Sequence, residues 1–460
     1  MNHAQTSNRI SAFSIHTSYF LSYLLNLAYA ITIALAFPWL LYQRLRHGKY
    51  REGWGAKFWG DLPKRHGHKP CLWLHAVSVG EVNLLEPILK RWDALHPDWD
   101  CVISTTTQTG YKLAQKKYAP RSVVYCPLDF TWAVSRAMRR IRPTLLVLTE
   151  LELWPNLVAA AKQHGAKIAI VNGRLGEKSH RGYQRVAWFV GRVLRQIDLI
   201  AVQNEDYAER FRSLGASPTS LQVTGSIKFD GARTDRNNSQ TQRLAQLAGI
   251  GSEDIVFLAG STQETEEALA LSVFERLSAE FPRLKLILVP RHPERFDDVA
   301  NLLTSRQANW QRRSALSNPH PSRPEPSPPI TLIDAIGELG AWWGAAHIAF
   351  VGGSLTNRGG QNMIEPAAYG AAVSFGPNTW NFRDVVTQFL DAEAAIVVKN
   401  EPDLESFVRR CLTDAPFAAN LGHRARDLVI RQQGATDRTI HLIDGLFSEN
   451  RHRKPTPKAA

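Results

Sequence analysis

A chain of 460 residues is longer than one ordinary hydrophobic core accommodates, so two domains are expected. Hydrophobic residues make up 44% and charged residues 21%, which excludes wholesale disorder, collagen-like repeats and coiled-coil rods. The net charge of +13 predicts an anionic partner, which is a nucleic acid, an acidic lipid or a phosphorylated ligand. The four cysteines are scattered without a CxxC pair, which disfavours a structural zinc site and a disulfide framework.

The first feature in chain order is an uncharged apolar run from Tyr19 to Leu41, long enough to cross a bilayer. Four basic residues at positions 44–51 follow it, so the positive-inside rule places the remaining chain in the cytoplasm. A cleaved signal peptide has the opposite charge order, and a buried core hairpin is the other alternative. The sequence predicts a tail over 1–16 and an uncleaved anchor helix over 17–43, either spanning the membrane or lying in its interface.

Beyond the anchor, short runs rich in β-branched residues alternate with helical patterns, which indicates parallel sheets covered on both faces. A polar stretch, Arg233–Gln242, is interpreted as a linker between domains over 44–232 and 243–449. Strands of the first domain are predicted at 72–77, 102–106, 122–125, 145–148, 167–171, 199–202 and 222–224. Strands of the second domain are predicted at 255–259, 284–289, 330–333, 348–351, 372–375 and 395–398.

Two such series predict an α/β protein with two doubly wound, Rossmann-like domains that face a cleft. Helical patterns cover 82–95, 154–164 and 184–196 in the first domain. A Pro/Ser-rich segment at 317–329 is interpreted as an exposed loop, and the basic tail over 450–460 is expected to be disordered. Ligands of such domains bind beyond the carboxyl ends of the strands, so functional residues are sought directly after each strand.

Glu81 follows the first predicted strand and a small Ser78-Val79-Gly80 turn, at the start of a helix. A carboxylate there is stabilised by the helix dipole, and a plain helix-start glutamate is one interpretation. A general base that removes a proton from a substrate is the other. The pattern alone leaves both open.

A second acidic pair, Glu150 and Glu152, follows the apolar strand at 145–148. In an extended segment, carboxylates two residues apart point the same way, and Pro155 then marks a helix start. Carboxylates at the edge of a buried strand are costly unless they are paired or functional, so a catalytic role and a capping role are both open. Lys228, after the last strand of this domain, is a solvated surface charge or a point charge for a leaving phosphate.

In the second domain, Arg291 closes a strand and suits bidentate phosphate recognition, although arginine is common at strand ends. Glycine pairs at 352–353 and 359–360 would let backbone N–H groups approach a phosphate, and Glu365 opens a helix where it can bind ribose hydroxyls. The chain has no P-loop, HExxH, GxSxG or zinc-deaminase motif and no His/Asp cluster at metal-ligand spacing, so no metal or cofactor is expected.

One stretch, Arg181–Arg195, combines four arginines with aromatic residues in a helical pattern. A helix of this kind lies on anionic membranes, and an ordinary surface helix with a core-facing side is the alternative. The preceding apolar run favours the membrane interpretation, because basic residues near an anionic leaflet add attraction.

Several of these segments are long and unusual, and together they resemble one known family. They are, in chain order, HAVSVGE, TELELWPN, GRL, VQNE, VTGSIKFD, LVPRHPERF, FVGGSL and GGQNMIEPAA. In this order they resemble the 3-deoxy-D-manno-octulosonic acid (Kdo) transferases of lipopolysaccharide assembly. The resemblance implies a membrane-associated, metal-independent, inverting glycosyltransferase of the two-domain GT-B class. Such an enzyme transfers Kdo from CMP-Kdo to a lipid A precursor, lipid IVA, at the cytoplasmic face of the inner membrane.

Carried over position by position, Glu81 matches the family's proton acceptor, and Glu150 and Lys228 match positions of transition-state stabilisation. The CMP-binding segments of the family are matched by Pro290, Arg291, Ile336, Gly337, Glu338, Asn362, Met363, Ile364 and Glu365. The chain departs from the family pattern at Gln263 and Gln361, where histidine is usual, and at Met363, where proline is usual.

Two other functions stay open as alternatives. The first is another membrane-associated GT-B enzyme, a transferase or epimerase that uses a UDP-sugar. The second is a membrane-tethered protein that binds nucleic acid or anionic lipid, suggested by the net charge. Because the basic residues are dispersed apart from two clusters, nucleic acid is not an expected partner. The oligomeric state is not predicted.

Overall fold

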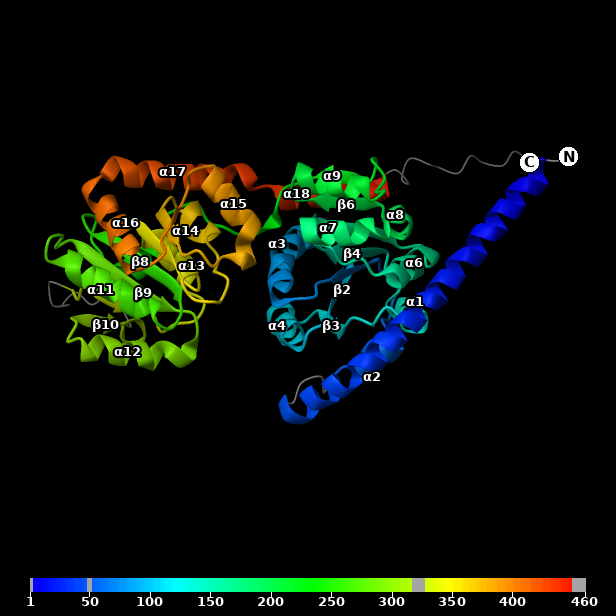
Figure 1. Cartoon of the computed structure of the whole chain (residues 1–460), viewed down its shortest axis with the longest axis horizontal. Coiled ribbons are helices and arrows are strands. Elements are labelled where there is room, and N and C mark those ends of the chain that lie inside the picture. Colours follow the sequence, from blue (N-terminus) through cyan, green and yellow to red (C-terminus); the bar gives the residue numbers. More distant parts are fainter. Residues whose placement is uncertain (1–2, 48–51, 317–326, 449–460) are drawn as a thin grey trace. The chain divides into compact units, whose positions relative to one another are not determined.

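The computed structural model describes residues 3–47, 52–316 and 327–448. The chain divides into two compact units, which Figure 1 shows in colours that follow the sequence. Unit 1 consists of Met1–Asp230 and Gly434–Ala460, and unit 2 consists of Gly231–Gln433. Most of the Pro/Ser-rich segment and the basic tail over 450–460 lie outside the described residues.

Unit 1 contains a seven-stranded sheet of order β3-β2-β1-β4-β5-β6-β7, in which the neighbouring strands are parallel. The strands are β1 Cys71–His75, β2 Asp100–Thr105, β3 Ser122–Tyr125, β4 Leu145–Thr149, β5 Lys167–Gly173, β6 Leu199–Val202 and β7 Leu221–Val223. Its helices are α1 His3–His47, α2 Trp54–Trp59, α3 Val79–Leu95, α4 Gln108–Tyr118, α5 Thr131–Ile141, α6 Pro155–Gln163, α7 Glu177–Gln184, α8 Ala187–Leu194, α9 Glu205–Ser213, the 3-10 turn η1 Ile227–Phe229 and α18 Ala435–Ser448.

Unit 2 repeats this arrangement with the order β10-β11-β9-β8-β12-β13-β14, again parallel. Its strands are β8 Ile255–Thr262, β9 Leu284–Pro290, β10 Trp310–Arg312, β11 Ile330–Leu332, β12 Ile348–Val351, β13 Ala372–Phe375 and β14 Ile396–Val397. Its helices are α10 Ser239–Ala248, α11 Glu266–Ser278, η2 Pro293–Arg295, α12 Phe296–Ser305, η3 Arg313–Ala315, α13 Leu339–Trp342, η4 Trp343–Ala345, α14 Ile364–Ala368, η5 Trp380–Phe382, α15 Arg383–Asp391, α16 Glu401–Thr413 and α17 Ala415–Gln432.

The prediction of two doubly wound α/β domains is therefore confirmed, and every predicted strand overlaps a strand of the structure. The sequence pattern does not predict β10, because its Trp-Gln-Arg sequence forms no apolar run. The four cysteines are free, in agreement with the absence of a CxxC pair.

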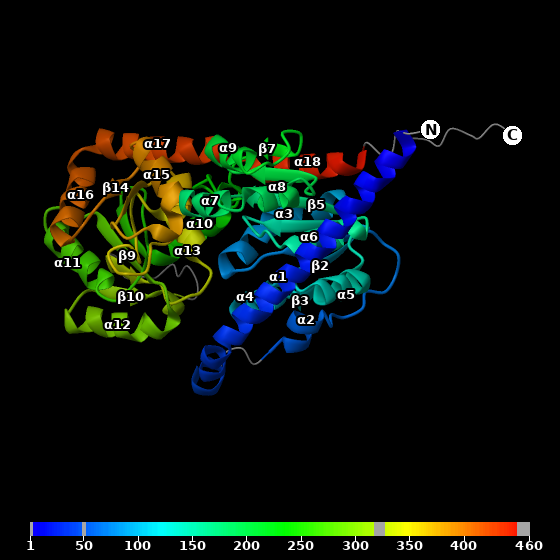
Figure 2. The ribbon, with the colours of Figure 1, turned by 45° about the vertical axis from the view of Figure 1, so that its right-hand side comes forward.

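The first element of unit 1 is the single long helix α1, which Figure 2 shows running beside α5 and α6. It begins at His3, so residues 3–16 are helical and not the separate tail that the sequence predicts. Its segment Leu21–Arg46 is long and apolar enough to cross a membrane.

The last helix, α18, differs from the predicted domain boundary, because it belongs to unit 1 rather than to a second domain ending at 449. It packs on α3, β5 and β6, where Ala435, Ile440 and Ile443 are buried in the unit 1 core. The N–H groups of Gly434 and Thr436 donate to the Asp230 carboxylate at 2.7 and 2.5 Å, which caps the helix start.

The predicted linker at 233–242 is also partly wrong, because α10 begins at Ser239 and Asn238 caps it. The Arg236 guanidinium donates to the carbonyls of Tyr369 and Ala346, at 2.6 Å each, so this segment is fixed within unit 2. A polar composition therefore marks the unit boundary but not a free linker.

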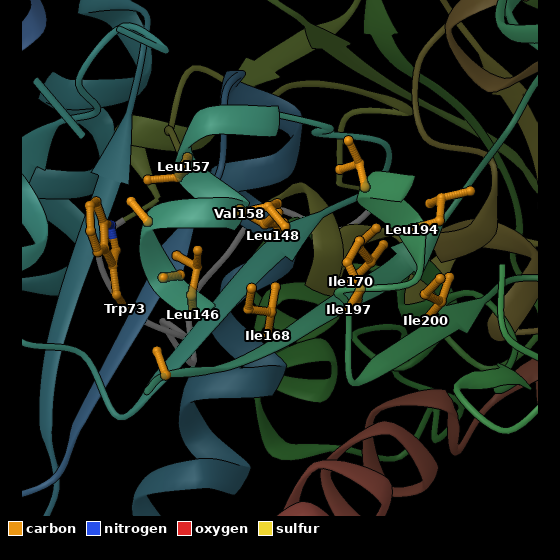
Figure 3. Packing of buried hydrophobic residues seen from close by; sticks show 14 of the residues in the cluster. Trp73, Leu146, Leu148, Leu157, Val158, Ile168, Ile170, Leu194, Ile197 and Ile200 are labelled. Atoms are coloured by element: carbon orange, nitrogen blue, oxygen red, sulfur yellow. The ribbon is translucent and has the colours of Figure 1, made fainter. Parts of the chain in front are cut away.

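The cores of both units are built on continuous apolar strands. In β4, Leu146 and Leu148 pack on one face with Leu157 and Val158 of α6, as Figure 3 shows. The alternate residues of β4 face the opposite core, where α3 and α18 cover the sheet. Burial on both faces explains why these strands show no polar alternation.

The basic stretch Arg181–Arg195 is not one helix. It breaks between α7 and α8, and Val190, Val193 and Leu194 of α8 are buried in the unit 1 core. Trp188 stays 61% exposed, with the Arg192 guanidinium 5.6 Å from its ring centroid. The surface-helix alternative thus describes most of this segment.

Candidate active site

The topological switch point of unit 1 lies between β1 and β4, because the chain proceeds from these neighbours toward opposite edges of the sheet. The segment with Glu81 follows β1, and Thr149 ends β4. The fold therefore brings together two of the segments that the sequence singles out. Ligands of doubly wound sheets bind at this position.

Glu81 lies in the first turn of α3 with 8% of its surface exposed, and hydrogen bonds hold both carboxylate oxygens. Oε1 accepts from the hydroxyl of Ser78 at 2.9 Å. Oε2 accepts from the N–H of Val77 at 2.9 Å and from the hydroxyl of Thr149 at 2.7 Å. The Ser78 oxygen in turn accepts from the N–H of Glu81 at 3.3 Å, so the residue also forms a capping box.

This arrangement caps the start of α3 and is also compatible with a general base. Three donors fix the orientation of the carboxylate, and a small fraction of the residue stays exposed. The Ser-x-x-Glu spacing is the signal for the Ser78 contact. Thr149 has no such signal, because it reaches Glu81 from another strand.

Glu150 directly follows β4 with a positive φ of 55°, so the chain turns there and is not extended. The expectation that this segment is extended is therefore wrong. Glu150 lies 3.7 Å from Nζ of Lys228 and 4.0 Å from Nε of Arg174. The structure thus places Glu150 and Lys228 together, with each side chain about a fifth exposed.

Glu152 points to a different partner, because it accepts from the indole N–H of Trp154 at 2.8 Å. Burial, reinforced by the negative charges of Glu81 and Glu150, raises the pKa of Glu152 to about 7. Unit 1 therefore places three glutamates near the switch point, with unequal environments. Such inequality is a property of acid–base sites and also of structural networks.

The corresponding switch point of unit 2 lies between β8 and β12. Here Glu266, at the first position of α11, is fully buried. Its carboxylate accepts from four backbone N–H groups, those of Gln263 (2.8 Å), Gly353 (2.7 Å), Ser354 (3.0 Å) and Leu355 (2.9 Å). The expectation that the first glycine pair offers its N–H groups to a phosphate is therefore wrong for Gly353.

Arg291 follows β9 with an exposed side chain, and Pro290 ends that strand. The Arg291 Nε donates to Oε1 of Gln361 at 3.2 Å. Gln361 follows the second glycine pair, where Gly359 and Gly360 have φ of 87° and 77°. Gln361 also packs on Gly353, whose missing side chain leaves room for it.

The other predicted nucleotide-binding residues fall into two groups. Asn362 donates to Glu365 at 2.9 Å and accepts from the N–H of Ile364, while Met363 and Ile364 are buried. Burial raises the pKa of Glu365. Oε2 of Glu365 lies 3.7 Å from the Cβ position that a side chain at Gly340 would occupy, close to the Ile336-Gly337-Glu338 turn.

Within that turn, Gly337 has a φ of 89° and Ile336 is 81% exposed. Glu338 is engaged elsewhere, because Arg313 donates to both its oxygens at 2.8 Å and Trp342 donates at 3.2 Å. Among the residues that the structure describes, no group of three or more His, Cys, Asp or Glu side chains is arranged to hold a metal ion.

Comparison with known proteins gives a consistent result. A family profile described as 3-deoxy-D-manno-octulosonic-acid transferase (kdotransferase) matches residues 50–231. The chain is 30% identical to a 3-deoxy-D-manno-octulosonic acid transferase of Haemophilus influenzae, over 84% of this chain and 90% of the relative. It is 32% identical to the enzyme of the same name from Chlamydophila psittaci, over 80% and 83% of the two chains.

Solved structures extend the comparison to the fold. One similar structure is a UDP-GlcNAc 2-epimerase from Neisseria meningitidis, bound to UDP-GlcNAc. The structural alignment covers 81% of this chain and 99% of the epimerase chain, with a TM-score of 0.54. The two sequences are 12% identical, so this likeness concerns the fold alone. It agrees with the expected GT-B-type class of two Rossmann-like domains.

Proposed function

The chain belongs to the 3-deoxy-D-manno-octulosonic acid (Kdo) transferase family, and from this we propose that it transfers Kdo from CMP-Kdo to a lipid A precursor, lipid IVA. The reaction is an inverting, single displacement that requires no metal. The observation that carries this proposal is the Glu81 carboxylate, held at the switch point of unit 1 by two hydroxyls and one N–H.

In the acceptor half of the reaction, Glu81 removes the proton of a sugar hydroxyl of the lipid while that oxygen attacks the anomeric carbon of Kdo. The new C–O bond forms as the bond between Kdo and the CMP phosphate breaks, and CMP leaves with the bonding electrons. Such base assistance is worth about 10²–10⁴ in rate. Glu150 keeps Lys228 in place, so that its ammonium offsets developing negative charge.

In the donor half, unit 2 binds the CMP group. Arg291 binds the phosphate, because Gln361 occupies only its Nε and leaves the outer nitrogens for a bidentate contact. The pair of Asn362 and Glu365 binds the ribose, and the Ile336-Gly337-Glu338 turn contacts the nucleotide through its backbone and Ile336. Fixed positive side chains supply the charge stabilisation that a metal ion supplies in other transferases.

The location proposed for the enzyme is the cytoplasmic face of the inner membrane. The apolar segment of α1 supports attachment, and the basic residues that follow it favour contact with the anionic lipid of that face. A net charge of +13 favours adhesion to anionic lipid and to a phosphorylated acceptor.

The test is incubation of the full chain with CMP-Kdo and a tetra-acylated lipid A precursor, with the products counted by mass spectrometry. We expect Kdo addition in the presence of EDTA, and loss of addition in Glu81→Gln with CMP binding retained. Glu86→Gln, an exposed glutamate of the same helix, is the matched control and should be active. Transfer from a UDP-sugar instead of CMP-Kdo would overturn the donor assignment.

A further inference from the structure

Over residues 21–46, where the structure describes the side chains of α1, Asn26 is the one buried residue, with 7% of its surface exposed, and it is polar. Its amide donates to the hydroxyl of Thr131 at 2.8 Å and accepts from the N–H of Thr131 at 3.1 Å. It also accepts from the amide of Asn156 at 3.4 Å. One turn later, the Tyr29 hydroxyl donates to the Asp129 carboxylate at 3.2 Å. We name these five residues the α1 clasp.

The clasp lies within a longer contact line. Asn26, Tyr29, Ile33, Ala36, Leu40 and Gln43 recur every three or four residues and are the less exposed positions of the helix. Between them runs a second stripe that is exposed and apolar, formed by Leu24, Leu27, Ile31, Leu35, Trp39 and Tyr42. The helix thus turns one face to unit 1 along its apolar length and the opposite face outward.

This contact is incompatible with a helix that crosses the bilayer. If Leu41 lay at the cytoplasmic boundary, Asn26 would lie about 22 Å deeper, because an α-helix rises about 1.5 Å per residue. The clasp would carry the start of α5 to that depth. Arg136 and Arg139 of the same helix are exposed, and charged side chains are costly within hydrocarbon.

We infer that α1 is a docked helix that lies in the plane of the membrane, with its exposed apolar stripe in one leaflet and its clasped face on unit 1. The inference rests on the membrane attachment proposed above. Its lipid partner is an anionic leaflet, because Arg44 and Arg46 flank the stripe. The five clasp residues donate to and accept from one another, which offsets the cost of burying their polar groups between α1 and unit 1.

The test uses a disulfide to lock the α1 clasp while the protein is in the membrane. In inner-membrane vesicles holding the full chain, Asn26→Cys with Thr131→Cys should form a disulfide on mild oxidation. Leu27→Cys with Thr131→Cys is the matched control and should not, because Leu27 is 58% exposed on the outer stripe. A tag on the amino terminus should be accessible to protease only from the cytoplasmic side.

We expect the locked enzyme to keep its rate of Kdo transfer within about twofold of the reduced form. Cross-linking no stronger than in the control pair, or a tag on the far side of the membrane, would overturn the inference. Loss of transfer on locking would also overturn it, because the docked helix would not be the working form. Cross-linking is measured by gel mobility, so a failure of the proposed reaction would be distinguished by an inactive reduced form.

Discussion

Both units place a glutamate in the first turn of the helix that follows their first strand, at the same topological position. In unit 1 this is Glu81, held by two hydroxyls and one N–H and slightly exposed. In unit 2 it is Glu266, held by four backbone N–H groups and fully buried. The position in the fold is shared, but the donors differ.

The difference is the one expected between a reactive carboxylate, as proposed for Glu81, and a structural one. Hydroxyl donors rotate and can release an oxygen, whereas backbone donors are fixed by the turn that they form. Glu266 fills a nest of N–H groups that would otherwise bind an anion, and it thereby shapes the loop around Gly353. Glu81, proposed above as the base, keeps 8% of its surface exposed. The predictions below test this contrast.

The largest effect is expected from Glu81→Gln, which removes the proposed base. The rate of transfer should fall by about 10²–10⁴, with thermal unfolding close to that of the wild type. Thr149→Val, which removes one hydroxyl from the carboxylate, should lower the rate by a smaller factor of about 10. Activity in both variants near that of the wild type would make Glu81 a capping residue only.

Glu266→Gln should act on structure rather than on chemistry. The glutamine amide has one acceptor oxygen fewer than the carboxylate, and its NH₂ group would face backbone N–H groups that also donate. We therefore expect the free energy of unfolding to fall by about 3 kcal/mol. Hydrogen exchange of the full chain, followed by mass spectrometry, should show loss of protection at Gly353–Leu355. The control is Glu264→Gln, an exposed residue of the same turn. Unchanged hydrogen-exchange protection at Gly353–Leu355 would contradict the structural role of Glu266.

A smaller effect is expected from Gln361→Leu, which frees the Arg291 Nε. Loss of one such hydrogen bond costs about 1 kcal/mol, or about fivefold, in the binding of CMP. The effect should appear in the KM for CMP-Kdo and not in kcat. Arg291→Ala should weaken CMP binding further, and calorimetric titration measures both. Equal affinity in all three proteins would remove Arg291 from the donor site.

The smallest effect concerns pH. Because burial and the charge of Glu81 raise the pKa of Glu152 to about 7, the folded chain keeps this proton where the unfolded chain has lost it. The contribution of Glu152 to stability therefore falls as pH rises from about 4.5 to about 7. Glu152→Gln should remove this fall, so its melting temperature relative to the wild type should rise by a few degrees between pH 5 and pH 8. If the melting temperatures of the two proteins changed with pH in parallel, the prediction would be wrong.

The sequence predicts one side of this contrast, Glu81, but not Glu266. Apolar runs located the strands, and the Ser78-Val79-Gly80 turn at a helix start marked Glu81, because both signals are local. Three of the four partners of Glu266 lie 87 to 89 residues away at Gly353–Leu355, so no local pattern links them to it. The turn at Glu150 depends on a positive φ, which a glutamate in the sequence does not predict.

The return of α18 to unit 1 has a consequence for synthesis. Unit 2 is one continuous stretch of chain, so the ribosome has synthesised all of its residues before it makes α18. Unit 1 begins first but lacks Ile440 and Ile443 in its core, and the partners of Asp230, until α18 has been synthesised. The unit that carries Glu81 therefore cannot complete its core before all of unit 2 has been made, and a chain cut short before residue 434 would contain all of unit 2 and an open core in unit 1.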